Sequence, residues 1–256
     1  MKVIDKALSR MPLVAAVILF VLALSAELLA QLSPGTLLPV MLSTSLNSSK
    51  DRQGKQVKGK LMQAVPLAEG GHIPQGARVR GQIVEVRALG RSSASRLVLT
   101  IDQVIYHGKS QHFTSNLRAL ASMTEVYNAQ LPTNNFADRG TTIADWVTEQ
   151  VGGDVVFRGS ATVFSPHGAQ VARTVNVGEV LGEPLATPGK GCRAGIGSDP
   201  TEQAFWIFST SACGLYGFED VKIAHAGRTD PRGKIVLESG RDLKIAGGSG
   251  WLLRTN

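Results

Sequence analysis

The sequence has few aromatic residues, and the common catalytic signatures are missing from it. Phe, Trp and Tyr make up 5% of the 256 residues, which argues against a large aromatic surface for stacking ligands. There is no Gly-x-Ser-x-Gly elbow, P-loop, His-Glu-x-x-His or Gly-x-Gly-x-x-Gly motif. We therefore predict no enzyme activity, and we assign no catalytic, cofactor-binding or metal-binding residue.

Cysteine is also scarce, because the chain has only Cys192 and Cys213. Two cysteines are too few for a zinc site, and neither belongs to a Cys-x-x-Cys pair. In an oxidising compartment they are predicted to form a disulfide, worth about 3 kcal/mol in the chain-entropy model. A catalytic thiol is the alternative. His107 and His112 flank a predicted turn, but two histidines alone make a weak metal site.

A short uncharged apolar run near the start of the chain indicates export. Three basic residues lie within Met1–Met11, the apolar run Leu13–Leu24 follows, and small residues come next at Ala26 and Ala30. This order is typical of a secretory signal peptide over residues 1–30. An uncleaved membrane anchor and a buried core helix are the alternatives. We expect the protein in the periplasm or cell envelope, or secreted.

Most of the remaining chain reads as short strands separated by turns. The 28 glycines favour many turns, and a period-two strand is indicated where Leu97, Leu99 and Ile101 alternate with Val98, Thr100 and Asp102. Thr36–Leu46 is also strand-like, with Pro39 indicating an edge strand or a strand start. A further turn is expected at His107–Lys109. The predicted fold is mainly β, a sandwich or barrel of short antiparallel strands.

Two helices are predicted to interrupt the strands near residues 116–151. The first is capped by Asn116 and ends before Pro132, and the second begins at a Thr142–Asp145 capping box and ends at Gly152–Gly153. The resulting division is a signal peptide or anchor at 1–30, a β domain at 34–115, a helical segment at 116–151, and a C-terminal β region at 152–256 that contains the cysteine pair.

Basic residues are concentrated in one stretch of the chain. Between Lys50 and Arg96 there are ten basic and three acidic residues, a net charge of +7 that equals the charge of the whole chain. The predicted basic surface comprises Lys50, Arg52, Lys55, Lys58, Lys60, Arg78 and Arg80, continuing to Arg87, Arg91 and Arg96. Such a face attracts DNA, anionic lipid or acidic envelope polymers. The alternative is a solvated sheet surface that resists aggregation.

The densest polar group is the sequence HAGRTDP, which holds His225, Arg228 and Asp230. If these side chains meet, a histidine beside a carboxylate is suited to general acid and base catalysis. The alternative is a structural turn in which Asp230 bonds the local backbone and pairs with Arg228.

Residues 35–109 resemble the periplasmic β-barrel domain of the conjugal-transfer TrbI-like family, the scaffold of type IV secretion machines. The resemblance rests on PGTLLPVML, GKLMQAVPL, HIPQGARVRG and LVLTIDQVIYHGK. It covers under a third of the chain, and the long Pro-rich spacer of that family is absent. In HIPQGARVRG, Gly76 is expected to adopt positive φ and Gly81 to allow close backbone approach. The chain also resembles a family of exported bacterial proteins with a C-terminal HAGR-type motif.

Together these features predict a non-catalytic exported cell-envelope protein, a β-rich scaffold or binding module that belongs to a secretion or envelope assembly. The expected partners are other envelope proteins or an anionic envelope polymer, with no specific nucleic acid and no cofactor. The alternative is an envelope hydrolase that acts on a polysaccharide or peptide through the His225, Arg228 and Asp230 region.

The mature protein is expected to begin after Ala26 or Ala30, because a signal peptidase cuts behind small residues. N-terminal sequencing of protein taken from the envelope fraction measures this directly. A chain that starts at Met1 and stays with the membrane would instead support the uncleaved anchor.

Overall fold

The computed structural model describes residues 32–67, 71–131, 146–152, 155–158, 163–164, 170–172, 180–182, 203–205, 207–209, 212–223 and 233–256. The predicted signal peptide at residues 1–30 lies outside these ranges. Within them, no helix has the length and apolar character needed to cross a membrane.

Strands account for nearly all of the regular structure, which confirms a mainly β fold. The first are β1 (Leu37–Leu42), β2 (Leu46–Asn47), β3 (Gln56–Leu61), β4 (Val65–Pro66), β5 (His72–Ile73), β6 (Arg78–Arg87), β7 (Ser95–Tyr106), β8 (Lys109–His112) and β9 (Ser115–Ala121). The helix α2 (Met123–Asn128) follows. The others are β10 (Trp146–Glu149), β11 (Val155–Arg158), β12 (Val163–Phe164), β13 (Gln170–Ala172), β14 (Val180–Gly182), β15 (Gln203–Phe205), β16 (Gly214–Tyr216), β17 (Val221–Ile223), β18 (Ile235–Ser239), β19 (Lys244–Ile245) and β20 (Gly250–Thr255).

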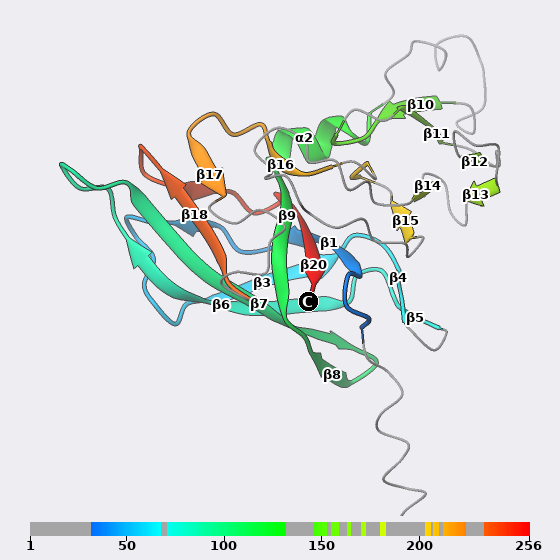
Figure 1. Cartoon of the computed structure of the whole chain (residues 1–256), viewed down its shortest axis with the longest axis horizontal. Helices are drawn as coiled ribbons and strands as arrows, with labels where there is room; N and C mark the ends of the chain where they lie inside the picture. The colour runs from blue at the N-terminus through cyan, green and yellow to red at the C-terminus, as the bar shows by residue number, and fades with distance from the viewer. Residues whose placement is uncertain are drawn as a thin grey trace, which may run out of the picture.

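Ten strands form one sheet in the order β16-β9-β20-β1-β3-β6-β7-β18-β17, with β8 beside β7 (Figure 1). All pairs in it are antiparallel except β16 with β9. The sheet joins strands from both sides of the predicted helical segment. Its two end strands, β16 and β17, are not paired with each other, so it is an open sheet and not a closed barrel. The other described pairs are β2–β19, β4–β5, β10–β11, β12–β13 and β14–β15.

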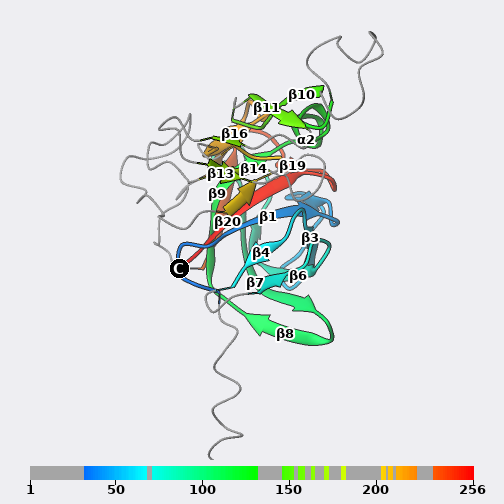
Figure 2. The same ribbon diagram turned by 90° about the vertical axis from the view of Figure 1, so that its right-hand side faces the viewer.

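The sheet is curved around a single inner core (Figure 2). Inward residues of β1, β3, β6, β7, β18, β9 and β20 all belong to one cluster, in which Trp251 is fully buried. Strand β3 alternates strictly, with Val57 and Leu61 buried and the intervening lysines exposed. This period-two pattern matches one face on a core and one face in water.

A second apolar cluster covers the outer face of β1, β20 and β9. It consists of Leu37, Met62, Ala119, Ala121, Val126, Ala129, Val151, Ile207, Phe208, Ala212 and Leu252. The helix α2 contributes Val126 to it, and the Ser122 side chain caps this helix by accepting from the Glu125 N–H at 3.3 Å. These three strands are therefore buried on both faces except at the exposed Met41 of β1, whereas the outer face of β3 and β6 is exposed.

The two-helix insertion predicted near 116–151 is wrong in the described residues. Ser115–Ala121 is strand β9, buried at every position between β20 and β16. In the described residues the short helix α2, six residues long, follows it. Trp146–Glu149 is strand β10, paired with β11, whereas the predicted capping box at 142–145 lies outside the described residues. A segment buried on both faces loses its alternating pattern, so its Leu and Ala residues resemble a helix.

Pro39 lies inside an interior strand, which corrects the expectation of an edge strand or a strand start. Its missing N–H faces β3 just beyond the end of the β1–β3 ladder, where the Met62 N–H donates to the Pro39 carbonyl at 2.8 Å. The Met62 carbonyl accepts instead from Gln75 Nε2 at 2.9 Å. A side chain thus replaces the ladder hydrogen bond that proline removes.

The turn predictions are confirmed. Gly76 has φ of 78°, and His107 and Gly108 have φ of 46° and 72°, as a two-residue hairpin turn between β7 and β8 requires. Gly81 sits at a bulge between β6 and β7, where a Cβ would lie 1.8 Å from the Thr100 carbonyl oxygen. No side chain fits there without moving the backbone of β7.

Replacement of Gly81 by Ala is expected to destabilise the fold by about 3 kcal/mol or more, because backbone atoms cannot make way as a flexible side chain does. Urea unfolding of the variant measures the loss. Gly240→Ala is the matched control, since nothing lies within 4 Å of a Cβ at that position. Equal unfolding midpoints for the two variants would contradict the close approach.

Candidate functional site

Four basic side chains lie side by side on the exposed face of β3 and β6. Lys58 and Lys60 of β3 and Arg78 and Arg80 of β6 are all exposed, whereas the residues between them are buried. The register places Lys58 directly opposite Arg80 and Lys60 directly opposite Arg78. We call these four residues the cation grid.

Like charges face one another in both cross-strand pairs of the cation grid. Residues directly opposite in an antiparallel pair have Cβ atoms about 4.5–5.5 Å apart, and like charges in these positions are destabilising. Among the described residues, no acidic group lies within ion-pair distance of any of the four. The grid is therefore a concentrated positive charge that the described part of the fold leaves without acidic partners.

A like-charge pair elsewhere in the same sheet does have acidic partners. Arg96 faces Arg87 across β6 and β7, but Arg96 pairs with Glu238 and with Glu85, the latter at 3.4 Å. Two carboxylates thus compensate that like-charge pair. Among the described residues, ion pairs therefore compensate the like-charge pair of Arg87 and Arg96 but neither pair of the cation grid.

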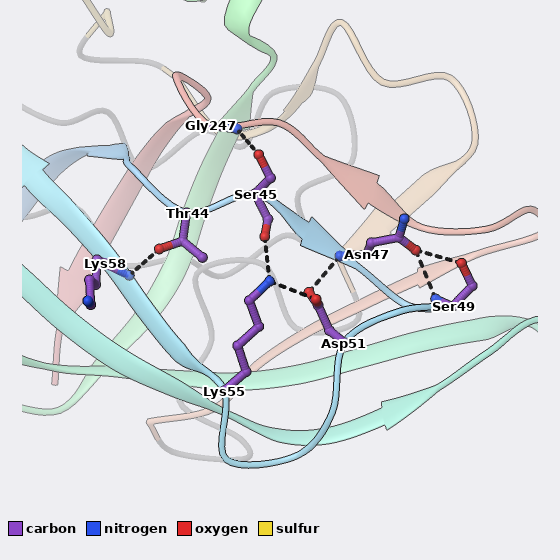
Figure 3. Close-up of polar contacts among 8 residues, drawn as sticks. All are labelled: Thr44, Ser45, Asn47, Ser49, Asp51, Lys55, Lys58 and Gly247. Atoms are coloured by element: carbon purple, nitrogen blue, oxygen red, sulfur yellow. Dashed lines mark hydrogen bonds and ion pairs between the residues drawn. The ribbon is translucent and has the colours of Figure 1, made fainter.

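Lys55 is another example of a compensated charge (Figure 3). Its Nζ donates to Asp51 Oδ1 at 2.7 Å and to the Ser45 carbonyl at 2.8 Å. Asp51 also accepts from the Asn47 N–H at 2.8 Å, so this pair closes the loop between β2 and β3. For Lys58, by contrast, the described hydrogen bonds involve the backbone: its N–H donates to Thr44 Oγ1 at 3.1 Å, and its carbonyl accepts from the Ser43 N–H at 2.8 Å.

The predicted basic surface is therefore divided into parts. Four of its members form the cation grid. Lys55 closes the loop between β2 and β3, and the same loop contains Lys50 and Arg52. Lys50 and Arg52 are exposed. The remaining predicted members, Arg87, Arg91 and Arg96, lie toward the far end of the β6–β7 hairpin, whose strands project from the body (Figure 1).

Polar residues continue the grid in two directions. Along β3 and β6 the next exposed pair is Gln56 opposite Gln82. Across the sheet, Gln103 of β7 lies opposite Arg80. Asp102 is the extra residue at the β6–β7 bulge, and its half-buried side chain makes no ion pair within the described residues. None of these neighbouring positions is aromatic.

The other predicted site residues are not brought together in the described structure. His225, Arg228 and Asp230 lie outside the described residues, as does Cys192, so the polar site and the disulfide stay predictions. Cys213 itself is buried. His107 occupies a turn, with its ring edge-on to Tyr106, and His112 is at the end of β8 opposite Gln103. No group of three potential metal ligands occurs among the described residues.

One buried charge was not identified by sequence reasoning. Arg118 of β9 is 1% exposed, and its Nε donates to the Ala212 carbonyl at 3.0 Å. A lone arginine within the Leu and Ala of Ser115–Ala121 was the available signal. Its contact fixes the segment around Ala212 against the sheet, which is a structural role.

Two cavities lie away from the grid. One of about 730 Å³ borders the turn between β16 and β17 and is lined by Leu215, Gly217, Phe218, Glu219, Val221, Lys222 and Ile223. Another of about 320 Å³ lies between α2 and Glu149–Gly152 and includes Glu125 and Tyr216. Neither contains a histidine or a cysteine among its described lining residues.

No family model, curated protein or solved structure matches this chain significantly.

Neutralising Lys55 and Lys60 separately is expected to have opposite consequences for stability. Lys55→Gln should lower the free energy of unfolding by about 1 kcal/mol, because it removes a charged hydrogen bond from a half-buried pair. Lys60→Gln should leave that free energy unchanged or raise it by a few tenths of a kcal/mol, because it relieves the repulsion with Arg78. Urea unfolding of both variants provides the comparison, and an equal loss in both would show that Lys60 also has a stabilising partner.

Proposed function

We propose that this protein is a non-catalytic, exported cell-envelope protein, a β-rich binding module whose cation grid binds an anionic envelope polymer. Export rests on the predicted signal peptide at residues 1–30. The binding role rests on the charge arrangement of β3 and β6.

The observation that carries this proposal is that the cation grid has no acidic partner in the part of the chain that the structure describes. Lys58, Lys60, Arg78 and Arg80 share one exposed face, in two like-charged pairs, and no described carboxylate forms an ion pair with them. A concentrated positive face raises the local concentration of anions and speeds their association. An anionic ligand relieves the repulsion that the fold itself leaves in place.

A scaffold role in a secretion or envelope assembly is the version of this function that the TrbI-like resemblance suggests. Gly76 and Gly81 have the backbone roles expected from HIPQGARVRG, which supports that motif at the level of local geometry. In an assembly, the same exposed face would meet an acidic surface of a partner protein. The hydrolase alternative rests on His225, Arg228 and Asp230, and no described contact favours it.

Binding to heparin, a generic polyanion, is expected to weaken steeply with salt, because displaced counterions drive the association. Between about 50 and 200 mM salt the affinity should fall at least about tenfold. Fluorescence anisotropy with labelled heparin measures it. Replacing all four grid residues by Gln should reduce the affinity about tenfold or more at low salt.

The matched control is a variant with Lys109, Lys222, Lys234 and Lys244 all changed to Gln. These four lysines are exposed and lie outside β3 and β6. Both variants lose four positive charges, so their net charge is the same. This variant should retain most of the affinity. If both variants lose affinity equally, binding follows net charge and the cation grid is not the site; a flat salt response excludes polyanion binding altogether.

A further inference from the structure

The geometry of the cation grid defines two adjacent positions for anionic groups. Each cross-strand pair brings one lysine and one arginine within about 5 Å at their Cβ atoms, close enough for both to reach the same anion. The two pairs are separated by two residues along the strands, which is about 6.8 Å for an antiparallel strand. A ligand that uses both positions therefore has successive anionic groups about 7 Å apart.

The composition of each pair suits a phosphate group. A guanidinium presents parallel N–H donors that bind two oxygens of one phosphate, whereas an ammonium acts as a point charge from another direction. Lys58 with Arg80 and Lys60 with Arg78 both provide this combination.

The spacing suits a chain of phosphodiesters. When three-carbon units link the phosphates, six covalent bonds separate neighbouring phosphorus atoms, and this link spans about 7 Å when it is extended. That length equals the separation of the two pairs along β3 and β6. A polymer of this kind can place one phosphate at each pair without bending.

The residues around the cation grid favour a ligand that runs along β3 and β6 over one that crosses the sheet. Along the strands, the exposed Gln56 and Gln82 supply uncharged hydrogen-bond donors beyond the grid. Across the sheet, the carboxylate of Asp102 stands at the β7 bulge and repels an anionic chain. The absence of aromatic residues at these positions removes base stacking, the interaction by which proteins hold single-stranded nucleic acid.

We propose that Lys58 with Arg80 and Lys60 with Arg78 form two phosphate subsites, which bind successive phosphates of a linear phosphodiester polymer running along β3 and β6. This inference rests on the proposed function and specifies its ligand.

The test uses abasic oligodeoxyribose phosphates of increasing length, because they have the phosphodiester spacing and no bases. A chain with two phosphates should bind the full protein about tenfold more tightly than a chain with one, and a third phosphate should add less than about twofold. For longer chains, two neutralised phosphates give a slope of about −1.4 for log K against log salt. A slope near −2.8, as expected for four independent contacts, would overturn the two-subsite arrangement.

Two double variants with the same net charge separate paired subsites from a diffuse positive surface. Lys58→Gln with Arg80→Gln removes one whole subsite, so the slope should halve and the benefit of the second phosphate should disappear. Lys58→Gln with Lys60→Gln leaves one arginine in each subsite, so the slope and the two-phosphate preference should persist at lower affinity. Equal behaviour of the two variants would contradict the pairing. Far-ultraviolet circular dichroism and urea midpoints verify that both are folded, and Lys58→Arg with Lys60→Arg provides a charge-conserving variant that should still bind.

Two further probes test the ligand class. Hyaluronan oligosaccharides have one carboxylate in each disaccharide, and tighter binding to them than to the abasic chains would overturn the phosphodiester assignment while leaving the proposed function intact. Phosphatidylglycerol vesicles offer phosphodiesters in a lipid surface, and preferential binding to vesicles would replace the polymer with a membrane. Failure to bind heparin or any of these probes would overturn the proposed function as well.

Discussion

Burial of one face of β3 and β6 is the constraint on which the charge arrangement depends. Val57, Leu61 and Val79 enter the inner core, so the intervening basic residues must point to solvent. A slip of one residue in either strand would carry two cations into the core, where unpaired charges cost several kcal/mol each. The hydrophobic core thereby fixes the register that places Lys58 opposite Arg80.

The strands of the sheet differ in how many of their faces are covered. β1, β20 and β9 are covered on both sides, by the inner core and by the second apolar cluster that includes Phe208. β3 and β6 are covered on one side only, and their open side bears the charges. β3 thus pairs with β1, a strand packed on both sides, and this support helps to keep the exposed polar side chains in defined relative positions.

Sequence reasoning predicted the β class, the turns at Gly76 and His107–Gly108, and the concentration of basic residues between Lys50 and Arg96. It missed strand β9, because Ser115–Ala121 is buried on both faces and has no alternation to read. It also treated the basic residues as a single surface. The structure divides them according to which residues oppose one another across the strands and according to the ion pairs of Lys55 and Arg96. Cross-strand register depends on how two strands pair, so the sequence of one strand alone does not predict it.

The pairing of β1 with β20 has a consequence for how the chain folds. These strands are adjacent in the sheet but lie far apart in the sequence, and β20 also joins β9. Contacts between distant segments are slow to form because a long loop must close first. The sheet is therefore incomplete until Gly250–Thr255 has joined it, because this strand lies between β1 and β9 and pairs with both. Local contacts alone therefore cannot complete the fold, which has to wait until these two distant strands meet.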